Sequence, residues 1–132
     1  MSSIIEVVAL ALQRKHDGRF LIARRGLDQS GAGFWEFPGG KVEAFESHTE
    51  ALVREIHEEF SVVLEPAGLQ FVDSAEHQYE TKKIKLFLWR YQISVIPNLI
   101  LTDHDQIQWC TPAEMKHFKL SPGDIYFIDK LL

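Results

Sequence analysis

The 132-residue sequence has little of several features that mark specialised classes of protein. Its single cysteine, Cys110, excludes an internal disulfide, and we expect this residue to be a small buried hydrophobe. No apolar run approaches the roughly 20 residues that span a bilayer. The N-terminal residues also carry no signal-peptide pattern. We therefore expect a cytoplasmic protein without a membrane partner.

Basic residues are scarce as well, with 14 Lys and Arg against 19 Asp and Glu, for a formal net charge of −5. An acidic chain has no general electrostatic attraction for a nucleic acid polymer or an anionic membrane. An anionic ligand would have to be held by local arginines and lysines or by metal ions. The length and the 45% hydrophobic content predict one globular domain, residues 1–132, and leave monomer and homodimer open.

The order of the predicted elements indicates an α+β protein. The predicted strands are rich in β-branched and aromatic residues and cover residues 4–14, 19–25, 34–37, 69–80, 82–96 and a short stretch near Trp109. Pro38 and two glycines are expected to stop the third strand. Two terminal helices are expected to begin after Thr111 and Ser121, because each of these hydroxyl residues can cap a helix and is followed by proline. A long helix between the strands completes a mixed sheet between helices.

That long helix lies in residues 39–64, GGKVEAFESHTEALVREIHEEFSVVL, which contain six glutamates. Ser47 and Glu50 form a capping box, so the helix is predicted to begin near His48. At about 100° per residue, one side of the helix is apolar and faces the core. This side carries Leu52, Val53, Ile56 and Phe60.

Three carboxylates, Glu55, Glu58 and Glu59, share a neighbouring arc of the same helix. Glutamates on a helix usually form a solvated face. Here the lysines that would compensate them four residues downstream are missing, and a glycine loop before the helix would bring backbone carbonyls close. Converging oxygen ligands suit Mg²⁺ or Mn²⁺. The pattern predicts a divalent-metal site for an anionic, phosphorylated ligand.

These residues resemble the box of the Nudix hydrolase family, G-x5-E-x7-R-E-U-x-E-E-x-G-U, where U is aliphatic. The positions that match are Gly40, Glu46, Arg54, Glu55, Ile56, Glu58, Glu59 and Val62. The departure is Ser61, where the family has the glycine that ends the helix in a left-handed conformation. The implied fold is the Nudix α/β/α sandwich with a mixed β-sheet.

Segments beyond the box, such as GFWEFPGGKVE and LSPGDIYFIDKLL, resemble MutT-type members of the family. This likeness implies hydrolysis of a (d)NTP to NMP and pyrophosphate with Mg²⁺ or Mn²⁺, with oxidised nucleotides such as 8-oxo-dGTP as the leading substrate. The alternative is a CTP or modified-pyrimidine pyrophosphohydrolase, which some segments resemble more. A non-catalytic Nudix-fold ligand sensor is a third possibility, against which the intact box argues.

The resemblance also assigns roles around the metal. Glu55, Glu58, Glu59 and the Gly39 carbonyl match the metal ligands. Arg54 matches the arginine that orients a glutamate, and Glu46 supports the site from outside. Asp103, in the loop before the last strand, is expected to bind metal or act as general base, with Asp105 as its substitute. His104 is expected to be a neighbour without a role.

Recognition of the nucleotide is implied for four residues: Arg25, Phe37, Lys41 and Asp124. Asp124 occupies the position at which 8-oxoguanine-specific MutT proteins carry an asparagine. An aspartate there can accept from a base amino group, whereas Ser121-x-x-Asp124 can instead form a helix cap. Trp35 and Phe37 could flank a base or belong to the core. Arg25 could instead be an ordinary surface residue.

Overall fold

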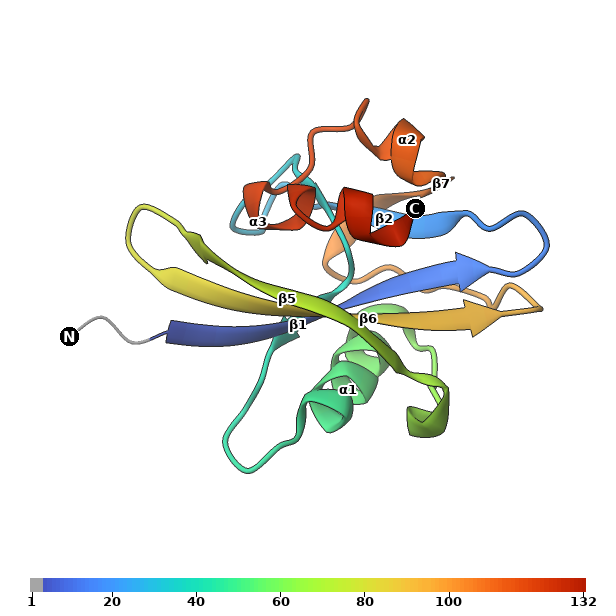
Figure 1. Ribbon diagram of the computed structural model, residues 1–132, viewed down its shortest axis with the longest axis horizontal. Coiled ribbons are helices and arrows are strands. Elements are labelled where there is room, and N and C mark those ends of the chain that lie inside the picture. Colours follow the sequence, from blue (N-terminus) through green and yellow to red (C-terminus); the bar gives the residue numbers. More distant parts are fainter. Residues whose placement is uncertain (1–3) are drawn as a thin grey trace.

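The computed structural model describes residues 4–132, in which helices cover both faces of one β-sheet (Figure 1). The strands are β1 (Ile4–Arg14), β2 (Phe20–Arg25), β3 (Trp35–Glu36), β4 (Gly39–Lys41), β5 (Gln70–Gln78), β6 (Lys83–Ile93) and β7 (His104–Cys110). The helices are α1 (His48–Phe60), α2 (Pro112–Met115) and α3 (Pro122–Ile125), with 3₁₀ turns η1 (Pro66–Gly68) and η2 (Ile128–Leu131).

The sheet is mixed, as the sequence predicts. Its main path runs β3-β2-β1-β6-β5, with β4 paired to β1 and β7 to β2. β1 and β6 are parallel along their whole length, whereas the other pairs are antiparallel. The predicted hairpin between β1 and β2 is present, and Gly18 adopts a positive φ of 70° in its turn. The expected α+β class is therefore confirmed.

β1 lies between two apolar cores because its alternate side chains point to opposite faces of the sheet. Val8, Leu10 and Leu12 pack with the apolar side of α1, which includes the buried Leu52 and Ile56. Ala9 and Ala11 face the other layer, in which the C-terminal segments contribute Met115, Phe127, Ile128 and Leu131. Figure 1 shows α1 on one face and α2, α3 and the C-terminal turn on the other. The two cores hold α1 and the C-terminal helices against opposite faces of the sheet.

Both ends of α1 follow local sequence chemistry. Ser47 and Glu50 form the predicted reciprocal capping box, and the helix begins at His48. Ser61 ends the helix with φ 58° and ψ 34°, which is the left-handed conformation that the family's glycine would occupy. On the apolar side Val53 is only half-buried, unlike its three partners.

Two expectations, one about the glycines before α1 and one about the cap of α3, are wrong. Gly39 and Gly40 do not form a loop but belong to β4, where Gly39 pairs with Ala9 of β1. A Cβ built on Gly39 would lie 1.9 Å from the Val8 carbonyl oxygen, so the missing side chain permits this close pairing. Ser121 does not cap α3 with its side chain, in contrast to Thr111, which forms a capping box with Glu114 at α2.

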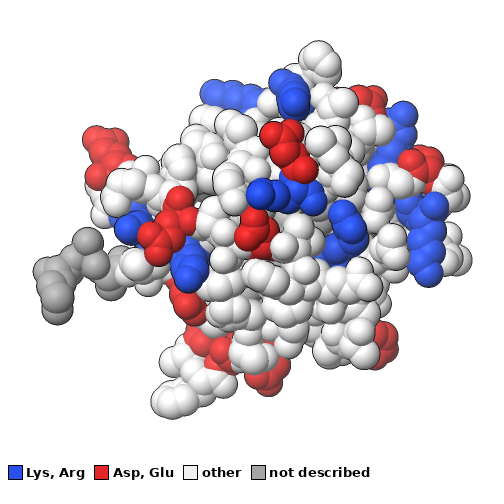
Figure 2. Space-filling model, in the orientation of Figure 1, with Lys and Arg blue, Asp and Glu red and all other residues white. Residues whose placement is uncertain are grey.

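Acidic and basic side chains are interspersed on the face shown in Figure 2. Salt bridges between elements, such as Arg19–Glu114 at 2.7 Å and Lys83–Glu76 at 2.9 Å, pair opposite charges across the surface. Within residues 4–132, no helix is long and apolar enough to cross a membrane.

Candidate functional site

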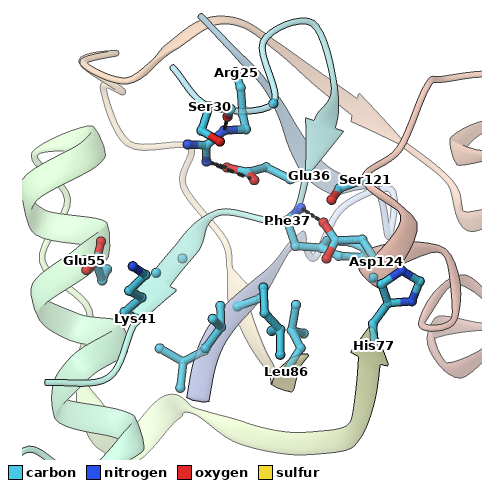
Figure 3. Close-up of a pocket in the computed structure, with 18 of the residues that line it drawn as sticks. Arg25, Ser30, Glu36, Phe37, Lys41, Glu55, His77, Leu86, Ser121 and Asp124 are labelled. Carbon is cyan, nitrogen blue, oxygen red and sulfur yellow. Dashed lines mark hydrogen bonds and ion pairs between the residues drawn. The ribbon is translucent and has the colours of Figure 1, made fainter. Parts of the chain in front are cut away.

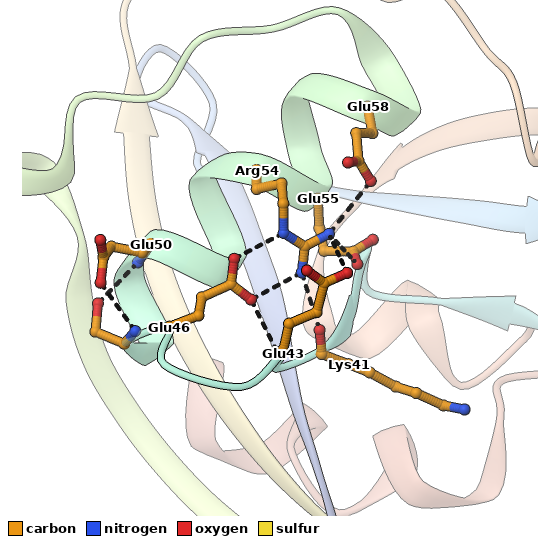
Figure 4. A network of polar contacts seen from close by, with 8 residues as sticks. Lys41, Glu43, Glu46, Glu50, Arg54, Glu55 and Glu58 are labelled. Atoms are coloured by element: carbon orange, nitrogen blue, oxygen red, sulfur yellow. Dashed lines mark hydrogen bonds and ion pairs between the residues drawn. The ribbon is translucent and has the colours of Figure 1, made fainter.

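A cleft of about 920 Å³ opens between α1, β4, the β5–β6 hairpin and α3. Its carboxylates come from segments far apart in the chain: Glu36, Glu43, Glu55, Glu59, Asp103 and Asp124. The other site residues from the sequence analysis that line it are Arg25, Phe37, Gly39 and Lys41. Glu46, Arg54 and Glu58 are absent from its described lining and form a network beside it (Figure 4).

Arg54 is the centre of that network. Its guanidinium holds Glu46 through two hydrogen bonds of 2.7 and 2.9 Å, and it contacts Glu55 at 2.9 Å and Glu58 at 3.3 Å. A further bond of 3.1 Å reaches the Lys41 carbonyl and so ties α1 to β4. Bonding to Arg54 lowers the pKa of Glu46 to about 2. The expectation that repulsion among the box acids is uncompensated is therefore wrong for Glu55 and Glu58, where one arginine takes the place of the missing lysines, but it holds for Glu59.

Glu55 is held between this arginine and the glycine strand. A Cβ built on Gly40 would lie 2.3 Å from Glu55 Cδ, so only a glycine allows the carboxylate its present place. Burial raises the pKa of Glu55, and the bond to Arg54 opposes that shift. The result is a half-buried carboxylate that is held at the edge of the cleft.

Glu59 is the most deeply placed of the three box carboxylates, with 5% of its surface exposed. Burial, together with the charges of Glu36, Glu55 and Asp103, raises its pKa to about 9. Its Oε2 atom has no hydrogen-bond partner among the described residues. A buried carboxylate without a partner is costly, and a bound cation would remove this cost. The acid-rich surroundings of this oxygen therefore fit a divalent metal.

Glu58 differs from its two neighbours. Its side chain is 59% exposed and bonds to Arg54 along the outer surface of α1 (Figure 4). The helical wheel places the three carboxylates on one arc, but only Glu55 and Glu59 line the cleft.

Asp103 lines the cleft immediately before β7, as expected from its position in the sequence. Asp105, its proposed substitute, instead forms a two-bond surface pair with Arg24 at 2.7 and 3.0 Å. Residues two apart would point to the same face of a regular strand, but Asp103 precedes β7, and the pairing of β7 with β2 shifts its register between Arg24 and Arg25. This irregularity lets one aspartate face the cleft while the other faces the surface. The geometry favours Asp103 over Asp105.

His104 is not a bystander, and that expectation is wrong. It is 4% exposed, stacks on Phe60 with ring centroids 5.3 Å apart, and places Nε2 2.8 Å from Glu36 Oε2. Ligand-type atoms of Glu36, Glu59 and His104 lie within 4.8 Å of one another. Glu36 and Glu59 line the cleft, so these three residues could hold a cation at its wall.

Glu36 is the site residue that the sequence analysis missed. Its carboxylate accepts hydrogen bonds from Arg25 at 3.1 and 3.3 Å (Figure 3). The same carboxylate contacts His104. Arg25 also donates to the Ser30 carbonyl, so its guanidinium is oriented from two sides. The available signal was an acid within the aromatic strand FWEF, where a partly buried charge needs a specific partner.

Asp124 closes the opposite end of the cleft. It is 4% exposed and accepts a 3.1 Å hydrogen bond from the Phe37 backbone N–H. Burial is the main cause that raises the pKa of Asp124 well above its usual value. The helix-cap alternative for Asp124 is wrong, because its carboxylate bonds to β3's neighbour Phe37 and not to the Ser121 backbone.

The aromatic residues near this end belong to the core. The Phe37 side chain is 3% exposed, and Trp35 packs edge-on against Phe118 at 5.0 Å. Phe37 therefore contributes chiefly its backbone N–H to the site, whereas Trp35 lies outside the described lining of the cleft. Lys41 is exposed at the rim, with its side chain extending away from the Arg54 network (Figure 4).

Comparisons with known proteins agree with this geometry. Residues 4–131 match the NUDIX domain. The CTP pyrophosphohydrolase of Escherichia coli K12 is 35% identical over 133 residues, which cover 98% of this chain and 92% of that protein. The 8-oxo-dGTP diphosphatase of Proteus vulgaris is 37% identical over 82 residues, which cover 62% of this chain and 70% of that protein.

A solved structure extends the likeness to the fold. The solution structure of the E. coli ORF135 protein superposes with a TM-score of 0.81 at 35% identity, covering 98% of this chain and 89% of that one. The domain match, the full-length relative and the arrangement of the box residues on α1 and β4 agree. The chain therefore belongs to the Nudix hydrolase family.

Proposed function

We propose that this protein is a Mg²⁺-dependent nucleoside triphosphate pyrophosphohydrolase that converts a cytosine nucleotide such as CTP to its monophosphate and pyrophosphate. The observation that carries the choice of base is the buried Asp124 carboxyl, which faces the cleft and is oriented by the Phe37 N–H. The full-length likeness to a CTP pyrophosphohydrolase supports the same choice.

The reaction requires water to attack a phosphorus atom that is surrounded by negative oxygens. A divalent cation, when bound, neutralises that charge and lowers the pKa of a water molecule. Glu55, Glu59, Asp103 and the Gly39 carbonyl would hold it, because all four residues line the cleft and the charges of Glu55 and Asp103 act on the Glu59 carboxyl. The unpartnered Glu59 oxygen supports this assignment.

The remaining charged residues have supporting roles in this proposal. Arg54 fixes Glu55 and forms the outer network with Glu46 and Glu58. Its bond to the Lys41 carbonyl holds α1 against β4. Arg25 and Lys41 supply positive charge at the cleft of an otherwise acidic protein, where they attract the triphosphate.

Asp124 can read a base because the Phe37 N–H binds its Oδ2 atom and leaves the other carboxyl oxygen available as a hydrogen-bond acceptor. Cytosine presents an amino group from which this oxygen can accept. Uracil carries an oxygen in place of that amino group and would leave the carboxyl oxygen unpaired.

A second candidate is 8-oxo-dGTP, the leading substrate in the sequence analysis. The likeness to the P. vulgaris 8-oxo-dGTP diphosphatase favours it, although over a smaller part of the chain. Guanine and its oxidised form also carry an exocyclic amino group, from which the same Asp124 oxygen could accept a hydrogen bond. A ligand sensor without catalysis is less well supported, because binding alone does not require so many buried acids around one unpartnered oxygen.

The test is pyrophosphate release from CTP, dCTP, UTP, dTTP, dGTP and 8-oxo-dGTP with Mg²⁺, for the wild type and for Asp124→Ala. We expect CTP to be hydrolysed best. Asp124→Ala should lower the kcat/KM for CTP by a factor that corresponds to a loss of about 1–3 kcal/mol of transition-state stabilisation, and it should change the kcat/KM for UTP little. A preference for 8-oxo-dGTP would establish the second candidate. Turnover of none of the six with Mg²⁺ or Mn²⁺ would refute the proposed activity.

A further inference from the structure

The loop between β5 and β6 is bound to the first turn of α3 through one side chain, Tyr79. The Gly123 backbone N–H donates to the Tyr79 hydroxyl at 3.0 Å, and that hydroxyl lies 3.2 Å from Ser121 Oγ. A Cβ built on Gly123 would lie 2.8 Å from the same hydroxyl oxygen, so the glycine makes room for this contact. Tyr79, Ser121 and Gly123 all line the cleft beside Asp124.

Tyr79 is itself held firmly enough to act as an anchor. The edge of its ring packs against the His77 ring, with centroids 4.6 Å apart and an interplanar angle of 65°. Its backbone N–H bonds to the Lys82 carbonyl at 2.8 Å, and the Gln78 side chain donates to both the Tyr79 and Lys82 carbonyls. The hydroxyl therefore projects from a braced turn of the sheet.

The first turn of α3 needs such an external contact. The helix has four residues, and its N-cap Ser121 makes no side-chain capping bond. A helix this short is not stable by itself, and its first N–H groups need partners from elsewhere. The Gly123 N–H finds that partner in Tyr79, one residue before the buried Asp124.

We infer that Tyr79 is a positioning residue for base selection: its hydroxyl holds the first turn of α3 and thereby places the Asp124 carboxyl against Phe37 and the base. This inference rests on the proposed role of Asp124 and adds to it a residue on a different element. Tyr79 need not touch the reacting phosphorus, so it should affect the choice and binding of the base and leave the chemical step unchanged.

The chain offers a matched control in Tyr126, which follows α3. Its hydroxyl donates to Asp73 of β5 at 3.1 Å, so it links the end of α3 to the β5–β6 hairpin. Tyr79 links the start of α3 to the same hairpin. Tyr126 is 49% exposed and is not among the residues that line the cleft. If base selection depends only on general contact between α3 and the β5–β6 hairpin, Tyr126→Phe should impair it as well. If it depends on the placement of Asp124, Tyr126→Phe should leave it unchanged.

The experiment compares Tyr79→Phe and Tyr126→Phe with the wild type. Phenylalanine keeps the ring contact with His77 and removes only the hydroxyl. For Tyr79→Phe we expect the KM for CTP to rise about threefold to tenfold, as for loss of one hydrogen bond, with kcat within about twofold. The CTP-to-UTP ratio of kcat/KM should fall by the same factor. Tyr126→Phe should leave this ratio unchanged.

Amide hydrogen exchange of the free proteins provides a readout that does not depend on turnover. In Tyr79→Phe the N–H groups of Gly123 and Phe37 should exchange faster, the second because the Asp124 carboxyl has moved. Unchanged exchange at both amides in Tyr79→Phe, or an unchanged CTP-to-UTP ratio in an active enzyme, would overturn the inference. Inactivity of the wild type on every nucleotide would refute the proposed function, and the exchange data would still decide whether Tyr79 positions Asp124.

Discussion

Gly40 lies so close to Glu55 that a Cβ atom built on the glycine would stand 2.3 Å from the Glu55 Cδ atom. The glycine belongs to β4 and the glutamate to α1, and Arg54 bonds to both Glu55 and the Lys41 carbonyl next to the glycine. The Nudix box thus joins a strand and a helix into one unit. The spacing of its glycine and glutamate follows from this contact.

Gly40→Ala should separate activity from stability. The added methyl group meets the end of a flexible carboxylate, which can move at little cost to the fold. A displacement of about 1 Å in such a ligand can lower kcat by about 10². Steady-state kinetics and thermal melts on the purified variant will measure the two effects.

Gly39→Ala is the matched comparison for that experiment. Its Cβ would lie 1.9 Å from the Val8 carbonyl oxygen, which is backbone within the central sheet and cannot move aside. We expect this variant to melt at a clearly lower temperature than Gly40→Ala. Wild-type kcat in Gly40→Ala would contradict the proposed placement of Glu55 in the active site.

Stability of the metal-free protein should fall as the pH rises between about 4.5 and 9. Burial raises the pKa of Glu59 to about 9, so the folded state keeps a proton that the unfolded state releases above its ordinary pKa of 4.5. Each such proton lowers the free energy of unfolding by up to about 1.4 kcal/mol per pH unit within that window. Asp124, whose pKa is also raised, acts in the same direction.

Thermal melts in EDTA at pH 5, 7 and 9 will test this dependence. Glu59→Gln should flatten the slope, since glutamine does not titrate. Mg²⁺ should stabilise the wild type most at pH 9, the value of the three at which protons compete least for the carboxylate. Glu58→Gln is the control, because the Glu58 side chain is 59% exposed and its removal should leave the slope as it is. A Glu59→Gln protein with the wild-type slope would show that Glu59 is ionised throughout.

Ser61→Gly should raise the free energy of unfolding by roughly 1 kcal/mol. Ser61 ends α1 in the left-handed conformation, which costs a residue with a Cβ about that amount and a glycine almost nothing. Urea denaturation will measure the gain, and kcat should stay at the wild-type value. Ser61→Ala keeps the Cβ and should show no gain. A loss of stability in Ser61→Gly would mean that the serine side chain contributes more than the strain costs.

The two aspartates that flank His104 should respond differently to removal of their charge. Asp103→Asn removes a carboxylate that lines the cleft, and we expect kcat to fall by about 10² or more. Asp105→Asn weakens only the surface pair with Arg24, which should change stability little and leave kcat unchanged. A larger loss of activity in Asp105→Asn than in Asp103→Asn would reverse this assignment.

Local sequence determined the parts of this protein that depend on neighbours in the chain. The capping box of Ser47 and Glu50, the apolar side of α1 and the left-handed Ser61 all follow from interactions within about one helical turn, and the structure has each of them. The β-branched and aliphatic residues of β1 likewise predicted a strand, which the structure has at Ile4–Arg14. These features were predictable because short-range periodicity sets them.

Only the tertiary structure decided which residues meet in the cleft. Glu36 and His104 are 68 positions apart, Phe37 and Asp124 are 87 apart, and Gly39 and Gly40 become a strand because β1 is beside them. None of these contacts leaves a periodic pattern in the sequence. Pairing between distant segments depends on how the sheet and its two cores assemble, and the pKa values of Glu59 and Asp124 depend in turn on the burial that this assembly produces.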